Sequence, residues 1–376
     1  MELLKYVSYI VGDMRLARLS LYIIFFQCAL LSFIIGQEVP EITIYKTSDY
    51  QAAQQNWSIT HDCEGYTYVA NTDGVLIYNG LSWTKVIMPN GHKPRTVAVG
   101  SECKVYVGGF EFFGWVDRSD PAQPIYQEIA DSVLSTIQQE IWQIVSADDE
   151  VYFQSFANLY RLTADQNITQ IPIPTNILLG NISEGTIYIP RVRQGLYVVD
   201  TEVQLVPFTN QLPEGSKIVT VFETQDGLLI FTEINGIYLV EENGLRAIAG
   251  PSVSRLTDDH INKCLRTSNG EYIIGTILGG VYIVDKNWQI KYHLNKSSGL
   301  SNNTVLALSE DASGNVWVGT DRGINVIHAE GNLLYFYDRS GKIGTVFTSV
   351  EKDGFIYLGS NQGVFVKQPG KLDLWL

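Results

Sequence analysis

Arg191 and Arg193 are the residues whose type and spacing most directly suggest binding chemistry. They lie two positions apart, so on an extended strand their side chains share one side of the backbone. Two guanidinium groups on one side can bind a carboxylate or a sulfate through paired hydrogen bonds. The pair therefore predicts an anion clamp, with solvated turn residues as the alternative.

Phe112 and Phe113 form an aromatic pair in the glycine-containing stretch 107–114. If this stretch is a loop, both rings are exposed, and exposed aromatic pairs mark a site for a partner or ligand. Aromatic rings beside planar hydrogen-bonding groups suit a glycan, another small ligand or a peptide. Charged residues at equivalent places in other segments complete the predicted ligand-binding set: Asp73, Glu111, Glu233, Asp321 and Arg322.

The sequence carries no recognisable catalytic or metal-binding motif. Its five histidines are scattered, without the spacing of a metal-binding pair, and no nucleophile elbow, phosphate loop or zincin helix occurs. The segment Ser309–Trp317 is similar to the Asp-box turn of sialidases, with one extra residue before Gly314. Such boxes are structural turns. We therefore expect no enzymatic activity, no catalytic residue, no metal and no cofactor, and a glycan-active hydrolase or lyase ranks third.

The amino-acid composition excludes further classes of function and of fold. The 376 residues include 26 Lys and Arg against 40 Asp and Glu, which gives a net charge of −14. Such a chain repels a phosphate backbone, so no nucleic-acid partner is expected. Hydrophobic residues make up 45% and charged residues 18%, as in a packed globular protein. Abundant glycine and aromatic residues favour many short strands and tight turns over helices.

The amino terminus has the pattern of an export signal. Residues 19–35 are uncharged and apolar, Arg15 and Arg18 precede them, and the small residue Gly36 follows. This arrangement predicts a signal peptide at residues 1–36, with a membrane anchor at residues 19–35 as the alternative. Both alternatives export the remaining chain, to the periplasm or the cell surface.

An internal repeat determines the predicted fold. Each copy has a strand, a short polar stretch, a turn residue and a second strand, and eight copies align. The turn positions are Gly74, Gly114, Asn158, Gly195, Gly236, Gly280, Gly323 and Gly363. Glycine at such a position provides a positive φ, and asparagine tolerates it next best.

Additional strands flank each copy, which makes four strands per unit at a spacing of about 41 residues, the period of a propeller blade. We expect an all-β chain whose residues 38–376 form a β-propeller of about eight four-stranded repeats. Residues 42–45 could complete the last blade. Residues 333–337, which follow the seventh repeat, are predicted to form the fourth strand of that unit. Seven blades would leave the eighth unit outside the ring, and eight would leave one strand too many. The sequence leaves both open.

Three cysteines follow the predicted signal peptide: Cys63, Cys103 and Cys264. Cys63 and Cys103 occupy matching positions in successive repeats, so a bridge between them is conceivable. The low cysteine density favours buried free thiols instead.

The segment from Leu300 to Ile327 resembles the two-component-regulator propeller repeat. The resemblance rests on Gly299-Leu300-Ser301, Glu310-Asp311, Gly314 to Trp317, Gly319-Thr320 and Gly323. Segments beginning at Tyr50, Tyr68 and Gly108 also resemble the amino-terminal propeller of Bacteroidetes-type sensor regulators. In that family, one or two periplasmic propellers precede a triple-tyrosine domain, a membrane helix and a cytoplasmic output module.

The resemblance implies a ligand-sensing propeller of a transcriptional or two-component signalling system, with a carbohydrate as the expected ligand. The chain ends at Leu376, directly after the eighth unit, and lacks the family's later modules. We therefore expect either a sequence truncated before its carboxy-terminal signalling module or a stand-alone propeller. The alternative function is a protein-binding propeller whose face grips another envelope protein.

Overall fold

The computed structural model describes residues 36–129, 139–147, 149–171, 180–183, 185–191, 193–199, 203–329, 331, 334–338, 343–367 and 374–375. The predicted signal peptide therefore lies outside the described residues, except for Gly36. Among the described residues, no helix is long and apolar enough to cross a membrane. The chain divides into two compact units, one of residues 39–334 and one that combines 1–38 with 335–376.

The unit of residues 39–334 contains seven four-stranded antiparallel sheets, here called blades 1 to 7. Blades 1 to 3 are β3–β6 (Asn56–His61, Thr67–Asn71, Gly74–Tyr78, Trp83–Val86), β7–β10 (Pro94–Val99, Val105–Gly109, Phe112–Asp117, Ile125–Glu128) and β11–β14 (Gln143–Ala147, Glu150–Gln154, Leu159–Leu162, Ile168–Ile171). Blades 4 to 6 are β15–β18 (Asn181–Ser183, Thr186–Arg191, Gly195–Val199, Val203–Leu205), β19–β22 (Ile218–Thr224, Gly227–Thr232, Ile237–Glu241, Gly244–Ile248) and β23–β26 (Ile261–Arg266, Tyr272–Thr276, Val281–Val284, Ile290–Leu294). Blade 7 is β27–β29 (Val305–Glu310, Val316–Thr320, Gly323–Ile327) with β2 (Ile42–Tyr45).

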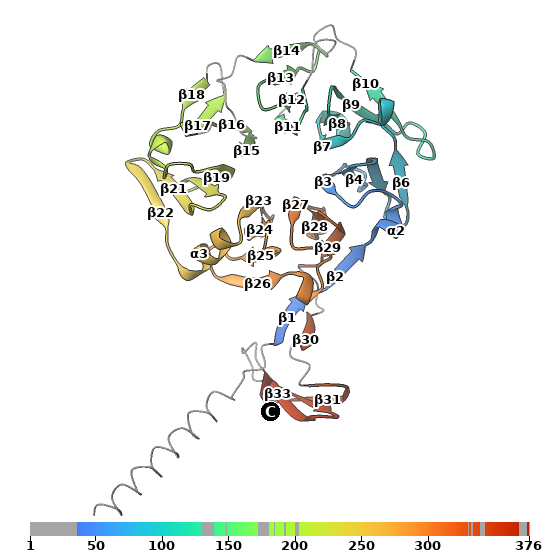
Figure 1. The fold of residues 1–376 in the computed structure, drawn as a ribbon, viewed down its shortest axis with the longest axis vertical. Helices are drawn as coiled ribbons and strands as arrows, with labels where there is room; N and C mark the ends of the chain where they lie inside the picture. Colours follow the sequence, from blue (N-terminus) through green and yellow to red (C-terminus); the bar gives the residue numbers. More distant parts are fainter. Residues whose placement is uncertain are drawn as a thin grey trace, which may run out of the picture. The chain divides into compact units, whose positions relative to one another are not determined.

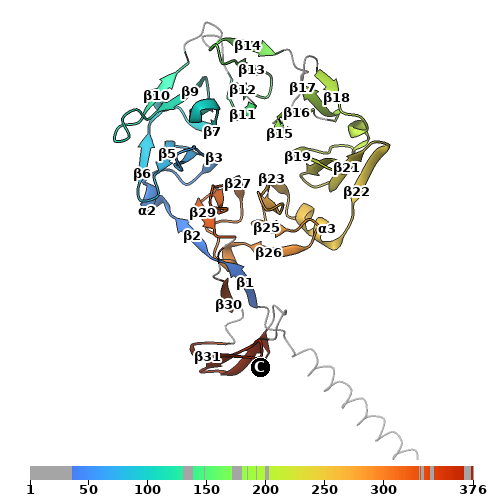
Figure 2. The same cartoon turned by 180° about the vertical axis from the view of Figure 1, so that it is seen from behind.

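The seven blades form a closed ring (Figure 1). The first strand of each blade lies innermost and contacts the first strand of the next, and β27 of blade 7 contacts β3 of blade 1. The view from behind shows the same order, with the outermost strands at the rim (Figure 2). Helical turns connect the strands: α2 (Thr47–Tyr50), α3 (Pro251–Asp258), η1 (Pro89–Gly91), η2 (Ser101–Cys103), η4 (Thr209–Gln211) and η5 (Lys296–Ser298). The all-β propeller prediction is confirmed, with seven blades in this ring.

Strand β2 closes the ring because it pairs with β29, from Ile42 opposite Ile327 to Tyr45 opposite Ile324. This pairing confirms that residues 42–45 complete the last blade. The prediction that residues 333–337 form a fourth strand of that blade is wrong, because β2 already occupies the free edge of β29. Instead, β30 (Leu334–Asp338) pairs with β1 (Gly36–Pro40).

The eighth repeat forms a separate four-stranded sheet in the other unit. Its strands are β31 (Val346–Lys352), β32 (Phe355–Ser360), β33 (Gly363–Lys367) and β34 (Leu374–Trp375). Every residue of β31 is exposed, including Phe347 and Val350.

Alternating side chains of each blade build two different cores. In blade 1, Tyr68, Ala70 and Ile77 pack with residues of blade 2, whereas Val69 and Leu76 pack with residues of blade 7. This alternation follows from the two-residue period of a strand. Because both faces of a blade are buried by its neighbours, the strands read as continuous apolar runs.

A disulfide joins Cys63 to Cys103, whose Cα atoms are 5.5 Å apart. The prediction of free thiols at these two positions is therefore wrong. Both cysteines lie between the first and second strands of adjacent blades, and the ring brings these turns within the span of a disulfide. Arg118 adds a second link at this place through Asp62, 2.9 Å away. Cys264 is a free thiol.

Candidate ligand-binding site

One face of the ring carries the loops between second and third strands together with the connections between blades; we call it the loop face. Backbone hydrogen bonds join the two kinds of segment in several blades. Glu233 N–H donates to the Lys217 carbonyl (2.9 Å), and Asp321 N–H donates to the Thr304 carbonyl (3.1 Å). These bonds bring the two kinds of segment together in these blades.

Phe112 and Phe113 are buried, so their prediction as an exposed aromatic pair is wrong. Only 6% of Phe112 and 1% of Phe113 are exposed. The ring of Phe113 stacks on Phe153 of blade 3 with centroids 4.2 Å apart. The exposed ring at this turn belongs to Phe110.

The backbone conformation of this turn explains why Phe112 and Phe113 are buried. The third strand of blade 2 begins at Phe112, two residues before Gly114, because Glu111 supplies the positive φ of the turn (61°). Gly114 is needed for another reason: a Cβ there would lie 2.2 Å from the Gln127 carbonyl oxygen on β10. Asn158 likewise has no positive φ, and its N–H is held by the Ser155 hydroxyl at 2.9 Å.

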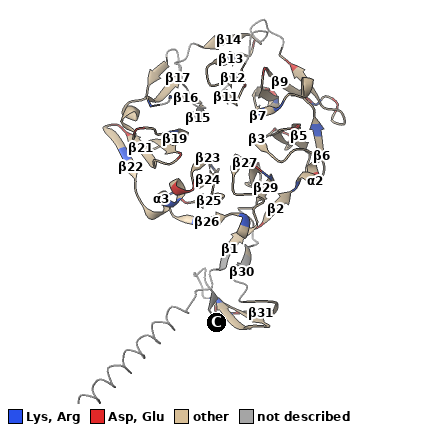
Figure 3. Ribbon diagram, in the orientation of Figure 1, with Lys and Arg blue, Asp and Glu red and all other residues tan. Residues whose placement is uncertain are grey.

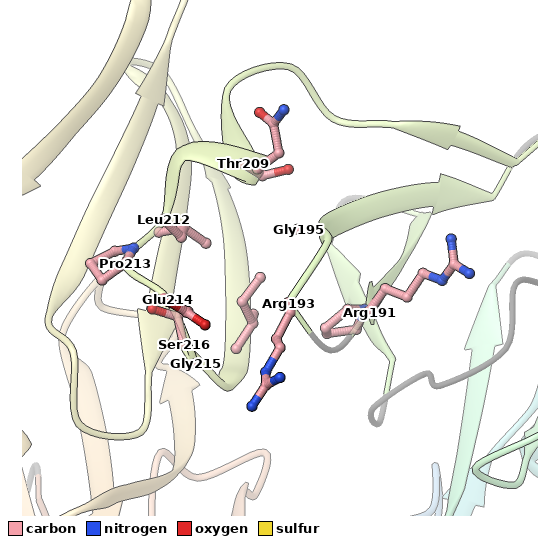
Figure 4. A pocket seen from close by; sticks show the side chains of 12 residues that line it. Arg191, Arg193, Gly195, Thr209, Leu212, Pro213, Glu214, Gly215 and Ser216 are labelled. Carbon is pink, nitrogen blue, oxygen red and sulfur yellow. The ribbon is translucent and has the colours of Figure 1, made fainter.

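Arg191 and Arg193 line one pocket of about 210 Å³, here called the loop pocket, between blades 4 and 5. Thr209, Glu214 and Ser216 line its other side. Arg193 is in a turn with φ of 60°, so the two arginines do not lie on one extended strand. Figure 4 shows their side chains extending away from each other. A clamp closing on one anion would require one of them to change rotamer.

The remaining predicted residues lie at turns of blades 1, 2, 5 and 7, and none of them is among the described residues that line the loop pocket. Asp73, Glu111 and Arg322 are exposed turn residues. Asp321 accepts a 2.7 Å hydrogen bond from Gln55 of blade 1. Glu233 forms an ion pair with Lys217 at 3.2 Å and lies 3.6 Å from His260.

Five of the innermost strands share an irregularity in their pairing with the second strand of the blade. In β3, β7, β19, β23 and β27, a bulge occurs at the second residue of the strand. A bulge turns its extra residue out of the sheet's pairing and often re-aims a side chain. The bulged residues are Trp57, Arg95, Val219, Asn262 and Leu306.

A larger cavity, here called the channel cavity, has a volume of about 490 Å³. Its lining comes from the first strands of blades 3, 5 and 6 and from adjacent loops. Trp142 and Phe156 contribute aromatic rings, and Lys217, Asn262 and Lys263 contribute polar groups. A cavity of this size, mainly apolar and with a few polar groups, is typical of a small-ligand site.

Trp142 is fixed by a cation–π stack at the beginning of the inner strands. The guanidinium carbon of Arg95 lies 4.5 Å from the Trp57 ring and 4.9 Å from the Trp142 ring. Arg95 also forms a 2.5 Å ion pair with Glu140, while the Phe156 ring lies 5.8 Å from Trp142 and is 49% exposed. The stack therefore presents a positioned aromatic surface to the cavity.

Lys217 and Lys263 are the charged residues among the described residues that line the cavity. Figure 3 shows that the inner strands are largely neutral. Burial lowers the pKa of Lys263, and the nearby charge of Lys217 lowers it further. Burial also raises the pKa of the neighbouring Cys264 thiol, which makes it a poor nucleophile.

Among the described residues, no group of three or more His, Cys, Asp and Glu side chains could hold a metal ion. The Asp-box-like segment is a turn: Asp311 accepts from the Asn315 N–H (3.0 Å) and the Trp317 indole N–H (2.9 Å). Both oxygens of this carboxylate thus hold the hairpin together.

Trp57, Arg95, Trp142 and Lys263 are not among the predicted site residues, because those predictions came from the loops between second and third strands. A pattern in the sequence marks the first three of these residues. The segments at the start of blades 1 to 3 align as Asn56-Trp57-Ser58, Pro94-Arg95-Thr96 and Ile141-Trp142-Gln143, with the large residue always in the middle.

Three comparisons with known proteins bear on the fold. The model of the two component regulator propeller family matches residues 299–322. The extracellular domain of BT3049 from B. thetaiotaomicron, described as a hybrid two component system, is similar with a TM-score of 0.67 at 16% identity. That of BT4673 from the same organism, described as a one component system, gives 0.62 at 17%. These alignments cover 88% and 90% of this chain but 48% and 47% of those structures, so the chain spans about half their length.

A streptogramin B lyase is also similar, with a TM-score of 0.58 at 12% identity over 79% of this chain and 98% of that one. No curated protein matches this sequence. At these identities the structural likeness demonstrates the fold, and the family match adds the repeat type. The seven-bladed ring and the match at residues 299–322 identify this chain as a β-propeller protein with a two component regulator propeller repeat.

Proposed function

We propose that this protein is the ligand-binding propeller of an extracytoplasmic signalling system, exported by the segment at residues 1–36, and that its ligand binds in the channel cavity. The observation that carries the proposal is the pair Trp142 and Phe156 in a cavity of about 490 Å³. The likeness to extracellular domains of one component and hybrid two component systems supports a sensor over other propeller functions.

The proposed ligand class is a glycan. Sugar rings present apolar C–H faces that pack on aromatic side chains, and their hydroxyls pair with planar groups such as the Asn262 amide. Arg95 holds Trp142 in place before any ligand arrives, so little ordering entropy is lost on binding.

A thermal-shift screen of the full chain against neutral and acidic oligosaccharides tests the proposal, with product analysis on every hit. A ligand that binds the folded state raises Tm by mass action, by an amount equivalent to about 2.7 kcal/mol at a hundredfold excess over Kd. A shift that Trp142→Ala abolishes supports the channel cavity. The absence of a shift with every glycan contradicts the proposal and favours a protein-binding propeller of the cell envelope.

The product analysis also addresses catalysis. The similarity to a lyase propeller makes cleavage the second outcome to measure. Intact glycan after prolonged incubation supports a binding function without enzymatic activity, and cleaved glycan would establish an enzyme.

A further inference from the structure

We propose that Lys263 is an anion-binding residue of the channel cavity and that the ligand carries a carboxylate or sulfate group. This inference rests on the proposed function, because it specifies the chemistry of the ligand placed in that cavity. It concerns a residue of the inner strand β23 that is not among the described residues lining the loop pocket.

In blades 1 to 3, the residue that corresponds to Lys263 forms a hydrogen bond to the next blade. Lys263 follows the bulge of β23, as Ser58 and Thr96 follow those of β3 and β7, and in blade 3 it corresponds in sequence to Gln143, the first residue of β11. Each of these neutral side chains hydrogen-bonds to the chain of the next blade. The Ser58 hydroxyl donates to the Val97 carbonyl (3.1 Å), Thr96 accepts from the Ile144 N–H (3.1 Å), and Gln143 donates to the Gly180 carbonyl (2.6 Å).

Lys263 does not make this kind of bond within the described residues. No hydrogen bond or ion pair joins its amine to another described side chain or carbonyl, although the residue is half-buried. The neighbouring Lys217 differs, because Glu233 neutralises it at 3.2 Å. Among the described residues that line the cavity are these two lysines and no carboxylate.

A half-buried ammonium without a counter-ion is costly, since burial disfavours the charged form. An anion that enters the cavity would supply the missing charge and convert this cost into binding free energy. The chain as a whole carries a charge of −14 and repels anions, so a positive group inside the channel selects ligands that also fit the aromatic wall. An acidic sugar meets both requirements: its carboxylate or sulfate faces Lys263, and its ring faces Trp142.

Calorimetric titration with matched probes tests this inference. Digalacturonate and N-acetylglucosamine 6-sulfate are compared with their neutral counterparts, galactobiose and N-acetylglucosamine. We expect an acidic probe to bind the wild-type protein and to bind Lys263→Gln about tenfold more weakly, which equals about 1.4 kcal/mol. Lys263→Arg should retain binding. Lys286→Gln, which removes an exposed lysine of the same blade, should bind as the wild type does.

Amine labelling of the wild-type protein provides a second readout that needs no variant. Acetic anhydride labelling and peptide mass spectrometry should show Lys263 protected by digalacturonate or by sodium sulfate. Equal binding of neutral and acidic sugars with unprotected Lys263 would overturn the anion site and leave the sensor proposal standing. Protection by sulfate without binding of any sugar would support the anion site and contradict the glycan sensor.

Discussion

Tyr45 and Trp317 stack face to face across the closure of the ring, with their ring centroids 6.0 Å apart and their planes inclined by 10°. Tyr45 belongs to β2, near the beginning of the described chain, and Trp317 belongs to β28 of the same blade. The Tyr45 hydroxyl also donates to the Tyr78 hydroxyl of blade 1 at 3.0 Å. The Tyr45 side chain of the closing strand β2 thus contacts both blade 7 and blade 1.

Tyr45→Ala should destabilise the protein by about 3 kcal/mol, because it leaves a cavity among Tyr78, Trp83 and Trp317. Tyr45→Phe keeps the ring and should cost about 1 kcal/mol, the contribution of one hydrogen bond. Urea unfolding followed by tryptophan fluorescence measures both. Equal losses for the two variants would mean that the hydroxyl, and not the stack, holds the closing strand.

The Cys63–Cys103 disulfide should contribute about 4 kcal/mol, because it closes a loop of 40 residues in the unfolded chain. The double variant Cys63→Ser/Cys103→Ser should therefore unfold at a clearly lower urea concentration. Dithiothreitol should lower the stability of the wild type and leave the double variant unchanged. A reductant effect of the same size on both would assign the loss to another cause.

His61 should make the protein less stable in mild acid. Its ring lies against Trp317 and bonds to Thr67 (3.0 Å), and burial lowers its pKa below the usual 6.5, while Asp311 and Asp62 oppose the shift. Between the two pKa values the unfolded chain binds a proton that the folded chain does not, so stability is lost as pH falls below about 6.5.

The measurement is urea unfolding at pH 7.5 and pH 5.5. His61→Gln should lose less stability between these values than the wild type, whereas His92→Gln should follow the wild type. An unchanged pH dependence in His61→Gln would rule out this histidine as the source.

Arg95→Leu should disorder the aromatic wall of the channel cavity. It removes two cation–π contacts worth about 1 kcal/mol each and leaves Glu140 without its partner. We expect lower stability and a red-shifted tryptophan emission, with weaker binding of neutral and acidic sugars alike. Arg95 does not line the cavity, so its role is to position Trp142.

Trp142→Ala and Lys263→Gln should separate the two parts of the proposed site. Loss of the ring should weaken neutral and acidic ligands by about tenfold, or 1.4 kcal/mol, since both use the stacking surface. Loss of the amine should weaken acidic ligands alone. Parallel effects of both variants on every ligand would indicate a general change of the cavity instead.

The repeats made the ring predictable, because a four-stranded unit cannot bury its two faces without neighbours. Residues 42–45 were recognisable as the closing strand, since they are a strand left over before the first complete unit. The fold thus follows from strand patterns along the chain. The disulfide did not follow, because pairing Cys63 with Cys103 depends on how closely the ring brings two turns together.

The candidate site was harder to predict because one residue of register decides which side chains are buried. Phe112 and Phe113 read as a loop when Gly114 is taken for the turn, yet Glu111 makes that turn and places both rings in the core. Lys263 was unremarkable as a residue type. Its interest comes from the bulge before it and from the neutral residues that replace it in blades 1 to 3.

Ring closure by β2 also dictates an order of events in folding. Thr43 and His328, whose side chains lie 3.0 Å apart across this junction, are 285 residues apart in sequence. During synthesis, the Ile-Thr-Ile-Tyr strand is made before any blade, whereas its partner β29 is made after the six blades that precede it in the sequence. Contacts of such long range slow folding and leave a β-prone edge exposed in the meantime. The closing strand is therefore the segment through which unfinished molecules would be captured by a chaperone or by one another.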